Sequence, residues 1–303
     1  MSASLLAPRL LRHPRGARCL SSGSRLGSAT RSESWSFLPI LNITKGLPAV
    51  YHTEPTASAF RAIIDMVKMR SGSLMVSKGS ELYGIVTERD VLDKLPFAIG
   101  SSRKLKVTDL MTPKSSLITA PPSFTLDQCV KAMHAGSFRH LPIVEGTGVR
   151  AVISMRDIAQ HVASALAKAP VGQPTTVREL MEAKGGPSCV ELPSSSSVGA
   201  AVEMMRSTRA GSILISSSEG FGIITERDYL TKVAVYDEAN PHDIPVTDIM
   251  TTSPYVKTVS ATGRISDCLS LMVAGGFRHL PVVDKAEVVG VISMRDILHY
   301  FLK

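Results

Sequence analysis

One stretch occurs four times, as Gly84-Ile-Val-Thr-Glu-Arg-Asp90, Ala151-Val-Ile-Ser-Met-Arg-Asp157, Gly222-Ile-Ile-Thr-Glu-Arg-Asp228 and Gly290-Val-Ile-Ser-Met-Arg-Asp296. Its hydroxyl residues are 67 positions apart in the first two copies and 68 in the last two. The first and third copies are 138 positions apart, and the second and fourth are 139 apart. A fixed period of this kind predicts a repeat protein in which a two-unit segment was duplicated whole.

An amphipathic helix is predicted ahead of each copy, because four apolar residues follow the spacing i, i+3, i+4, i+7. The four sets are Phe60, Ile63, Ile64 and Val67; Leu126, Cys129, Val130 and Met133; Val198, Ala201, Val202 and Met205; and Ile265, Cys268, Leu269 and Met272. A glycine follows each set, as helix C-termini prefer, at Gly72, Gly136, Gly211 and Gly275. Short apolar strands are then expected at 73–76, 140–144, 212–215 and 279–283. A second strand enters the repeated motif, and a second helix begins at its hydroxyl residue.

Three of the units also carry a similar lead-in segment. These lead-ins read Val107-Thr-Asp-Leu-Met111, Val177-Arg-Glu-Leu-Met181 and Val246-Thr-Asp-Ile-Met250, and none is recognisable before the first unit. One such unit cannot bury its apolar surface alone, so the units are expected to pair. The predicted boundaries are 1–34 for a leader and 47–98, 105–164, 175–236 and 244–303 for the four units, with a linker at 164–176.

The positive charge of the chain is concentrated at its beginning. Six of the 34 basic residues are arginines within positions 1–32, which hold no acidic residue, so 28 basic residues face 26 acidic ones elsewhere. Arginine, serine and leucine without acids are typical of a mitochondrial presequence and predict a matrix protein. A plastid transit peptide and a disordered basic tail on a cytoplasmic protein are the alternatives. No apolar run reaches the ~18 residues of a membrane span.

Several functional classes receive no support from the sequence. The near-neutral body and 5% aromatic content do not favour nucleic-acid binding. No nucleophile, base and orienting group form a recognisable set, so we predict no catalytic residue and no metal site. Cys129 and Cys268 lie 139 positions apart inside predicted helices, where we expect buried, unreactive thiols.

The repeated motif has a structural interpretation and a functional one. A Thr or Ser with an acid three residues later is close to a capping box, in which the two side chains satisfy free amide groups at a helix start. The same junction offers amide donors and the positive end of a helix dipole to a phosphate. An ionised aspartate there can accept both hydroxyls of a ribose, an arginine precedes it in every copy, and the glycine leaves room for a flat base.

These motifs together resemble the CBS (cystathionine β-synthase-type) domain family. The resemblance rests on the lead-ins, on Phe138-Arg-His-Leu-Pro142 and Phe277-Arg-His-Leu-Pro281, and on the four motifs, and it covers about residues 47–303. It implies an α/β fold of four β-α-β-β-α units, paired about pseudo-two-fold axes into two Bateman modules, roughly 47–164 and 175–303.

The resemblance also implies which residues bind a ligand. Phosphate or ribose contacts fall on Thr87, Ser154, Thr225 and Ser293, ribose contacts on Asp90, Asp157, Asp228 and Asp296, and phosphate contacts on Arg139, His140, Arg278 and His279. The fourth unit keeps every element, so Ser293 and Asp296 are expected to form one of the better sites. Ala151 replaces the expected glycine, which puts base entry at the second motif in doubt.

By this resemblance the protein is a non-catalytic regulator that binds an adenosine-containing ligand between paired units. AMP, ADP or ATP is the expected ligand, with S-adenosylmethionine or an NAD-type nucleotide as alternatives. The γ subunit of AMP-activated protein kinase is similar in carrying four such units, which implies energy sensing and a kinase-like partner. Small organellar CBS proteins imply a thioredoxin-like partner instead. The competing function is a nucleotide-independent interaction or dimerisation scaffold, with a homodimer among the assemblies it allows.

Overall fold

The computed structural model describes residues 38–44, 46–47, 49–146, 148–167, 175–186, 189–218 and 220–301. All of them belong to one compact unit, residues 32–303. The predicted leader, residues 1–34, lies outside the described residues. Residues 168–174 of the predicted linker also lie outside them. Helix α8 continues to Leu166, inside the segment predicted as that linker.

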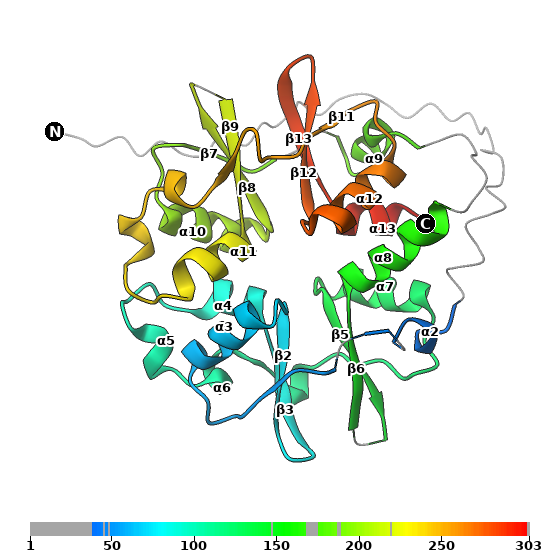
Figure 1. The fold of residues 1–303 in the computed structure, drawn as a ribbon, viewed down its shortest axis with the longest axis vertical. Helices are drawn as coiled ribbons and strands as arrows, with labels where there is room; N and C mark the ends of the chain where they lie inside the picture. Colours follow the sequence, from blue (N-terminus) through cyan, green and yellow to red (C-terminus); the bar gives the residue numbers. More distant parts are fainter. Residues whose placement is uncertain are drawn as a thin grey trace, which may run out of the picture. The chain divides into compact units, whose positions relative to one another are not determined.

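The first half of the chain forms two units of the same design, shown in blue to green in Figure 1. Repeat 1 consists of β1 (His52–Thr53), α3 (Ala59–Lys68), β2 (Ser73–Lys78), β3 (Glu81–Thr87) and α4 (Glu88–Lys94). Repeat 2 consists of a bridge at Ala120, α7 (Leu126–Ala135), β5 (His140–Glu145), β6 (Gly148–Ser154) and α8 (Met155–Leu166). Short elements before and between them are α2 (Leu41–Thr44), α5 (Ser101–Lys104), α6 (Val107–Leu110), β4 (Thr112–Pro113) and η1 (Lys114–Ser116).

The second half repeats this order in yellow to red in Figure 1. Repeat 3 consists of β7 (Glu191–Pro193), α10 (Val198–Thr208), β8 (Ser212–Ser217), β9 (Gly220–Thr225), α11 (Glu226–Tyr229) and the π-helical η2 (Leu230–Ala234). Repeat 4 consists of β11 (Val259–Ser260), α12 (Ile265–Gly275), β12 (His279–Asp284), β13 (Glu287–Ser293) and α13 (Met294–Phe301). The remaining elements are α9 (Val177–Ala183), η3 (Pro241–Asp243), η4 (Val246–Asp248) and β10 (Thr251–Thr252). The predicted fold class of four β-α-β-β-α units is confirmed.

The four repeats share their sheet register from the first residue of the hairpin to the motif glycine or alanine, beyond which repeats 1, 2 and 4 have a register shift that repeat 3 lacks. The first strand is parallel to the hairpin, and the hairpin strands are antiparallel, with the motif hydroxyl opposite the first residue of the hairpin. Ser154 thus lies opposite His140, and Ser293 lies opposite His279. This register brings the Arg-His strand and the hydroxyl–aspartate motif to the same end of each hairpin in repeats 2 and 4.

Two of the motif glycines are required by a neighbouring strand. Strand β4 pairs with β3, and a Cβ at Gly84 would lie 2.2 Å from the carbonyl oxygen of Thr112. Strand β10 pairs with β9 in the same way, and a Cβ at Gly222 would lie 2.7 Å from the sulfur of Met250. Among the described strands only β5 pairs with β6, so Ala151 is accommodated in repeat 2. The interpretation of these glycines as space for a base was therefore wrong for Gly84 and Gly222.

The apolar faces of the helices are buried between the two halves of the chain. One core joins repeats 1 and 3, with Ile63 and Met66 of α3 and Val202 and Met205 of α10 fully buried. The other core joins repeats 2 and 4, with helices α7, α8, α12 and α13 packed together. Because each core needs a repeat from each half, the stability of one half depends on the presence of the other.

The predicted apolar stripes are correct for three helices and wrong for α3. The sets on α7, α10 and α12 are buried throughout. In α3 the buried face is Ala59, Ala62, Ile63 and Met66, whereas the predicted Phe60, Ile64 and Val67 are only partly buried. Phe60 instead lies under the guanidinium of Arg103, whose Cζ is 3.8 Å from the ring centroid. Small alanines carry the helix packing there, so a search for large apolar residues selected the neighbouring face.

A lead-in segment precedes repeat 1 after all. The amide of Ile40 donates to the oxygen of Phe124 (2.8 Å), as the amide of Val177 donates to that of Gly263 (2.8 Å). The amide of Leu126 donates to the oxygen of Leu38 (3.1 Å), as that of Ile265 donates to the oxygen of Thr175 (3.1 Å). Residues 38–44 therefore correspond to residues 175–181 at a shift of 137 positions. The sequence Ile-Leu-Asn-Ile-Thr hid this relation because it lacks the Val and Met of the other lead-ins.

Candidate functional site

All four hydroxyl–aspartate motifs form helix caps. In each, one carboxylate oxygen of the aspartate accepts from the amide and the hydroxyl of the residue three positions earlier. Those donors lie at 2.9 and 2.7 Å for Thr87, 2.7 and 2.6 Å for Ser154, 2.9 and 2.6 Å for Thr225, and 2.8 and 2.8 Å for Ser293. The capping interpretation is correct for every copy, so any ligand must use what the cap leaves free.

The four aspartates differ in whether a lysine neutralises them. Asp90 contacts Lys94 at 2.7 Å, and Asp228 contacts Lys232 at 2.7 Å, in both cases from the next turn of the same helix. Asp296 contacts Lys184 at 2.7 Å, from the end of α9. Asp157 contacts no Lys or Arg within the described residues. Lysines therefore occupy the outer carboxylate oxygens of Asp90 and Asp228, whereas Lys184 contacts the capping oxygen of Asp296.

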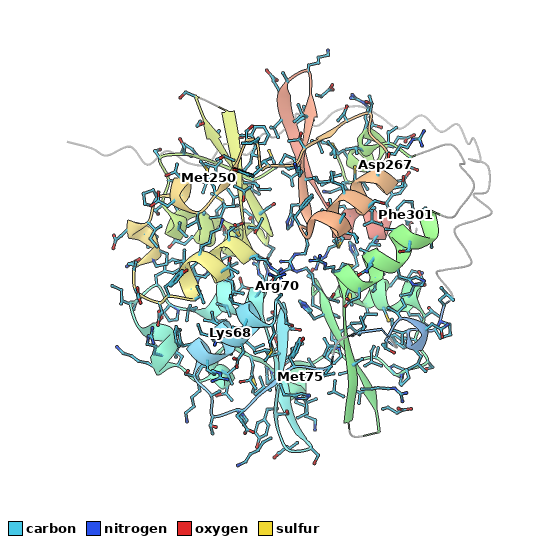
Figure 2. All side chains as sticks on the ribbon, in the orientation of Figure 1. Lys68, Arg70, Met75, Met250, Asp267 and Phe301 are labelled. Atoms are coloured by element: carbon cyan, nitrogen blue, oxygen red, sulfur yellow. The ribbon has the colours of Figure 1, made fainter. Side chains whose placement is uncertain are left out.

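Two buried glutamates lie where the four repeats meet. Glu88 accepts from Arg227 (2.7 and 2.9 Å) and Arg278 (2.7 Å), which come from repeats 3 and 4. Glu226 accepts from Arg89 (3.1 Å) and from Arg139, which come from repeats 1 and 2. Each glutamate side chain is only 1% exposed. Every repeat thus contributes an arginine to a central ion-pair network, and Figure 2 shows nitrogen-bearing side chains gathered near Arg70 at this centre.

Burial and neighbouring charges fix the ionisation of this centre. Burial alone would raise the pKa of Glu88, but the guanidiniums of Arg278 and Arg227 hold that pKa well below its ordinary value. Burial, together with the surrounding arginines, lowers the pKa values of His140 and His279 to about 3 each. Both imidazoles are therefore neutral at pH 7, and the arginines supply the positive charge.

Two glycines, at the same position of repeats 1 and 3, make space for these imidazoles. A Cβ at Gly72 would lie 2.8 Å from Nε2 of His140, and one at Gly211 would lie 2.9 Å from Nε2 of His279. Helices α3 and α10 have already ended at Lys68 and Thr208. The prediction that these glycines close the helices was therefore wrong, because close packing against the histidine of the paired repeat requires them.

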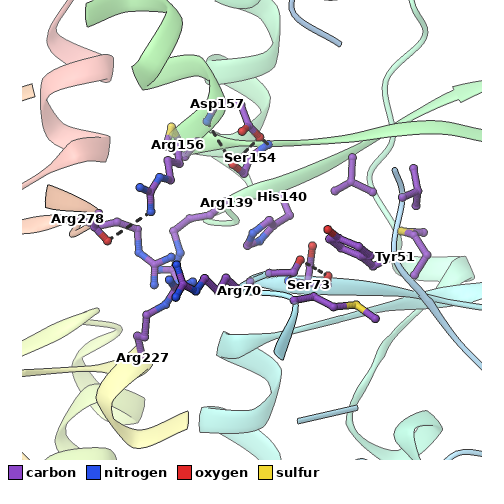
Figure 3. A pocket seen from close by; sticks show the side chains of 18 of the residues that line it. Tyr51, Arg70, Ser73, Arg139, His140, Ser154, Arg156, Asp157, Arg227 and Arg278 are labelled. Carbon is purple, nitrogen blue, oxygen red and sulfur yellow. Dashed lines mark hydrogen bonds between the residues drawn. The ribbon is translucent and has the colours of Figure 1, made fainter. Parts of the chain in front are cut away.

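A cavity of about 500 Å³ lies between repeats 1 and 2. Five arginines line it, together with Ser154 and Asp157 and an apolar part formed by residues such as Tyr51, Met75 and Val152; these arginines are Arg70, Arg139, Arg156, Arg227 and Arg278. Figure 3 shows the guanidiniums of Arg70, Arg139 and Arg227 close together on one side, with Tyr51 on the opposite side. Ser154 and Asp157 lie between these two ends. Asp157 is the single acidic residue of the lining.

A second cavity, of about 250 Å³, lies between repeats 3 and 4. Thr225 and Asp228 line it, with the exposed Tyr255 and with Lys257. It shares Arg227, Gly276 and Arg278 with the first cavity, so the two cavities lie on either side of the same pair of arginines.

The structure brings only some of the predicted site residues together. Those that line the first cavity are Arg139, His140, Ser154, Asp157 and Arg278, and those that line the second are Thr225, Asp228, Arg278 and His279. Thr87, Asp90, Ser293 and Asp296 line neither cavity. The larger of the two cavities opens at the second motif, where Val152, rather than Ala151, lines it.

The sequence reasoning missed Tyr51, Arg70 and the two buried glutamates. A signal for the glutamates was present, because the residue after the motif hydroxyl is Glu in repeats 1 and 3 but Met in repeats 2 and 4. Met155 and Met294 are buried, so a glutamate at the same position must also be buried and must find cationic partners.

Among the described residues, the two buried cysteines and the acidic side chains form no second kind of site. Burial raises the pKa values of Cys129 and Cys268 to about 12 and about 11, so both thiols are unreactive at pH 7. No group of three or more His, Cys, Asp or Glu side chains within the described ranges is placed to hold a metal. Nor is any helix in those ranges long and apolar enough to cross a membrane.

Comparison with known families matches two segments, residues 107–164 and 246–303, to the model of the CBS domain. The chain contains two CBS domains. The matched segments contain repeats 2 and 4, and repeats 1 and 3 have the same order of strands and helices.

Relatives with the same domain support the assignment. CBS domain-containing protein CBSCBSPB1 of Arabidopsis thaliana is 26% identical over 286 residues, which cover 80% of this chain and 50% of that protein. CBSX3, a mitochondrial CBS domain-containing protein of the same plant, is 32% identical over 108 residues, covering 35% of this chain and 52% of that protein. The chain thus spans about half the length of these relatives.

A solved structure shares the complete fold. Protein MJ1225 of Methanocaldococcus jannaschii, described as a proposed archaeal homologue of γ-AMPK, matches with a TM-score of 0.73 and 17% identity. The match covers 87% of this chain and all of that one, so the arrangement of four units is shared.

Proposed function

We propose that this CBS-domain protein is a non-catalytic regulator that binds an adenine nucleotide in the cavity between repeats 1 and 2. The observation that carries the proposal is the order of groups along that cavity. A ribose-binding pair, Ser154 and Asp157, lies between an apolar end with Tyr51 and an end with five arginines. Base, sugar and phosphate follow one another in a nucleotide in the same order.

The charge of the cavity selects among the candidate ligands. Five guanidiniums line the cavity, and three of them are paired with Glu88 or Glu226, so Arg70 and Arg156 leave an excess of positive charge that favours an anion such as ADP or ATP. Each guanidinium has five N–H donors. Glu88 occupies only two donors of Arg227 and one of Arg278, which leaves others for phosphate oxygens. S-adenosylmethionine fits less well, because its sulfonium would bring a further positive charge, whereas an NAD-type nucleotide offers two phosphates.

The ion-pair network provides a route by which binding can be sensed. Arg227 and Arg278 belong to repeats 3 and 4, yet they line the cavity between repeats 1 and 2 and hold Glu88 of repeat 1. A phosphate that draws these guanidiniums toward itself competes with Glu88 and alters the contact between the two halves. In our proposal a partner protein, kinase-like or thioredoxin-like, responds to that change.

Isothermal titration of the full chain with AMP, ADP, ATP, S-adenosylmethionine and NADH tests the proposal. We expect ADP or ATP to bind, and Asp157→Asn to weaken binding by roughly 10- to 150-fold, since a charge-assisted hydrogen bond contributes about 1.5–3 kcal/mol. Asp109→Asn is the matched control, because the exposed Asp109 caps helix α6 by accepting from the amide of Lys106 (2.8 Å). Equal affinities for wild type and Asp157→Asn would refute the assignment of the site.

The scaffold function is favoured by one observation, the complete set of capping bonds at all four motifs. On that account Asp157→Asn changes thermal stability only, and no nucleotide binds to the wild type. Binding to the wild type that Asp157→Asn weakens, without a matching loss of stability, excludes this alternative.

We further propose that the protein acts in mitochondria. The acid-free, arginine-rich positions 1–32 and the relative CBSX3, named as mitochondrial, support this location. A fluorescent fusion of residues 1–40 should enter mitochondria, and a fusion in which the six leader arginines are replaced by glutamine should not. A cytosolic wild-type fusion would contradict the proposal.

A further inference from the structure

Arg156 differs from most arginines of the larger cavity in what holds it. Three of the five pair with a buried glutamate, whereas Arg156 and Arg70 pair with no carboxylate within the described residues. The exposed Arg156 donates instead to two backbone oxygens of repeat 4, those of Gly276 (3.4 Å) and Val273 (3.5 Å). Both distances exceed the usual range of about 2.7–3.2 Å, so these two hydrogen bonds are weak.

The two oxygens that Arg156 contacts lie at the end of α12. This helix ends at Gly275, and Gly276 follows it in the left-handed conformation (φ 74°). The last carbonyl groups of a helix have no partner within the helix, and they form the negative end of its dipole. A guanidinium beside them stabilises the helix end. Arg156 of repeat 2 therefore supports a helix of repeat 4, across the contact between the two halves of the chain.

The cavity arginines are not equally placed for the first phosphate of a nucleotide. Figure 3 shows Arg70, Arg139 and Arg227 as one group, whereas Arg156 lies apart from that group, with its guanidinium turned toward the segment of Arg278. The group offers enough N–H donors to satisfy the oxygens of a single phosphate. A second phosphate brings further negative charge, and Arg156 is the arginine outside the group that no carboxylate within the described residues neutralises.

We infer that Arg156 makes the site prefer nucleotides with two or more phosphates, because it leaves the end of α12 and binds the second phosphate. This inference rests on the proposed function for its ligand, an adenine nucleotide. With AMP bound, Arg156 stays at the end of α12. With ADP bound, it turns into the cavity, and the oxygens of Val273 and Gly276 lose this donor. The end of α12 then differs between the two complexes, which gives a partner protein a feature by which to distinguish them.

Isothermal titration of the full chain with AMP and with ADP tests the inference. Arg156→Gln should weaken ADP binding by roughly 10-fold and AMP binding by less than about 2-fold, because only ADP uses this guanidinium. Arg70→Gln should weaken the binding of both nucleotides, since Arg70 belongs to the group that holds the first phosphate. Arg295→Gln is the matched control, because Arg295 has the same motif position in repeat 4, donates to the oxygen of Phe138 (3.2 Å) and lines neither cavity. The control should leave both affinities unchanged.

Hydrogen exchange at the end of α12 gives a second readout, which uses the wild-type chain and so does not depend on the folding of a variant. ADP should speed the exchange of the amides in residues 272–275, because the helix end loses the guanidinium that supports it. AMP should leave their exchange unchanged. Arg156→Gln without ligand should show the faster exchange that ADP produces in the wild type. Equal exchange in the AMP and ADP complexes would overturn the inference.

The titrations separate this inference from the proposed function. Equal weakening of AMP and ADP by Arg156→Gln, or no weakening of either, would overturn the inference, and the proposed function stands if Asp157→Asn weakens both nucleotides. If Asp157→Asn weakens neither while Arg156→Gln weakens ADP alone, the ribose assignment fails and the inference holds. A wild-type chain that binds neither nucleotide overturns both.

Discussion

Glu88→Gln is the substitution that most severely tests the central ion-pair network. The Glu88 carboxylate is 1% exposed and accepts three hydrogen bonds from Arg227 and Arg278, at 2.7 to 2.9 Å. Glutamine keeps the shape, but it removes the negative charge and points amide donors at one of the two guanidiniums. Breaking a buried pair in this way costs about 3–5 kcal/mol. Because the Arg227 side chain is 35% exposed, solvent screens part of the loss, and we expect a value near the lower end, about 3 kcal/mol.

Urea denaturation followed by far-ultraviolet circular dichroism measures this loss as a change in unfolding free energy. Glu145→Gln is the matched control, since Glu145 pairs with Arg150 on the surface and both side chains are more than half exposed. That control should lose about 0–1 kcal/mol. ADP should stabilise Glu88→Gln more than it stabilises the wild type, because a phosphate can replace the missing charge. A loss for Glu88→Gln no larger than that of the control would refute the network as a stabilising feature.

Two further predictions concern the histidines and the motif glycines. Burial holds the pKa values of His140 and His279 at about 3, against about 6.5 in the unfolded chain, so stability is complete above pH 6.5 and falls as the pH decreases. Between pH 7 and 5.5 the unfolding free energy should drop by about 2–3 kcal/mol for the two histidines together. His140→Gln should remove roughly half of this pH dependence of the unfolding free energy, and an unchanged pH dependence would contradict the account. Gly84→Ala should destabilise the protein by about 1–3 kcal/mol, because the Cβ of the new alanine would lie 2.2 Å from the carbonyl oxygen of Thr112. Ala151→Gly should cost no more than about 1 kcal/mol, because no further strand among the described residues pairs with β6 there. Similar losses of stability for the two variants would contradict the assigned role of β4.

The repeat was predictable from the sequence because it depends on local pattern. The period located all four hairpins and caps, and the i, i+3, i+4, i+7 spacing located three of the four apolar faces. The spacing failed in α3, because Ala59 and Ala62 pack against the core there and a search for large apolar residues passes over alanine. The lead-in at residues 38–44 was missed for a similar reason, because its backbone bonds match those of residues 175–181 while its side chains do not.

The site was less predictable because it is assembled from distant residues. The motif identified Ser154 and Asp157, but the sequence gives no indication that Arg227 reaches across to the cavity between repeats 1 and 2. Nor did the motif distinguish Asp157 from Asp296, which looked at least as favourable. One difference between them is the contact of Lys184 with Asp296, across 112 positions of sequence, which depends on the packing of α9 against α13.

A crystal structure of the full chain with ADP tests the central claim most directly. The account predicts ADP in the cavity between repeats 1 and 2, with its ribose hydroxyls on the carboxylate of Asp157. Its phosphates should lie within hydrogen-bonding distance of Arg139 and of Arg227 or Arg278 from the other half of the chain. A nucleotide bound elsewhere, or one in this cavity whose ribose points away from Asp157, would contradict the account.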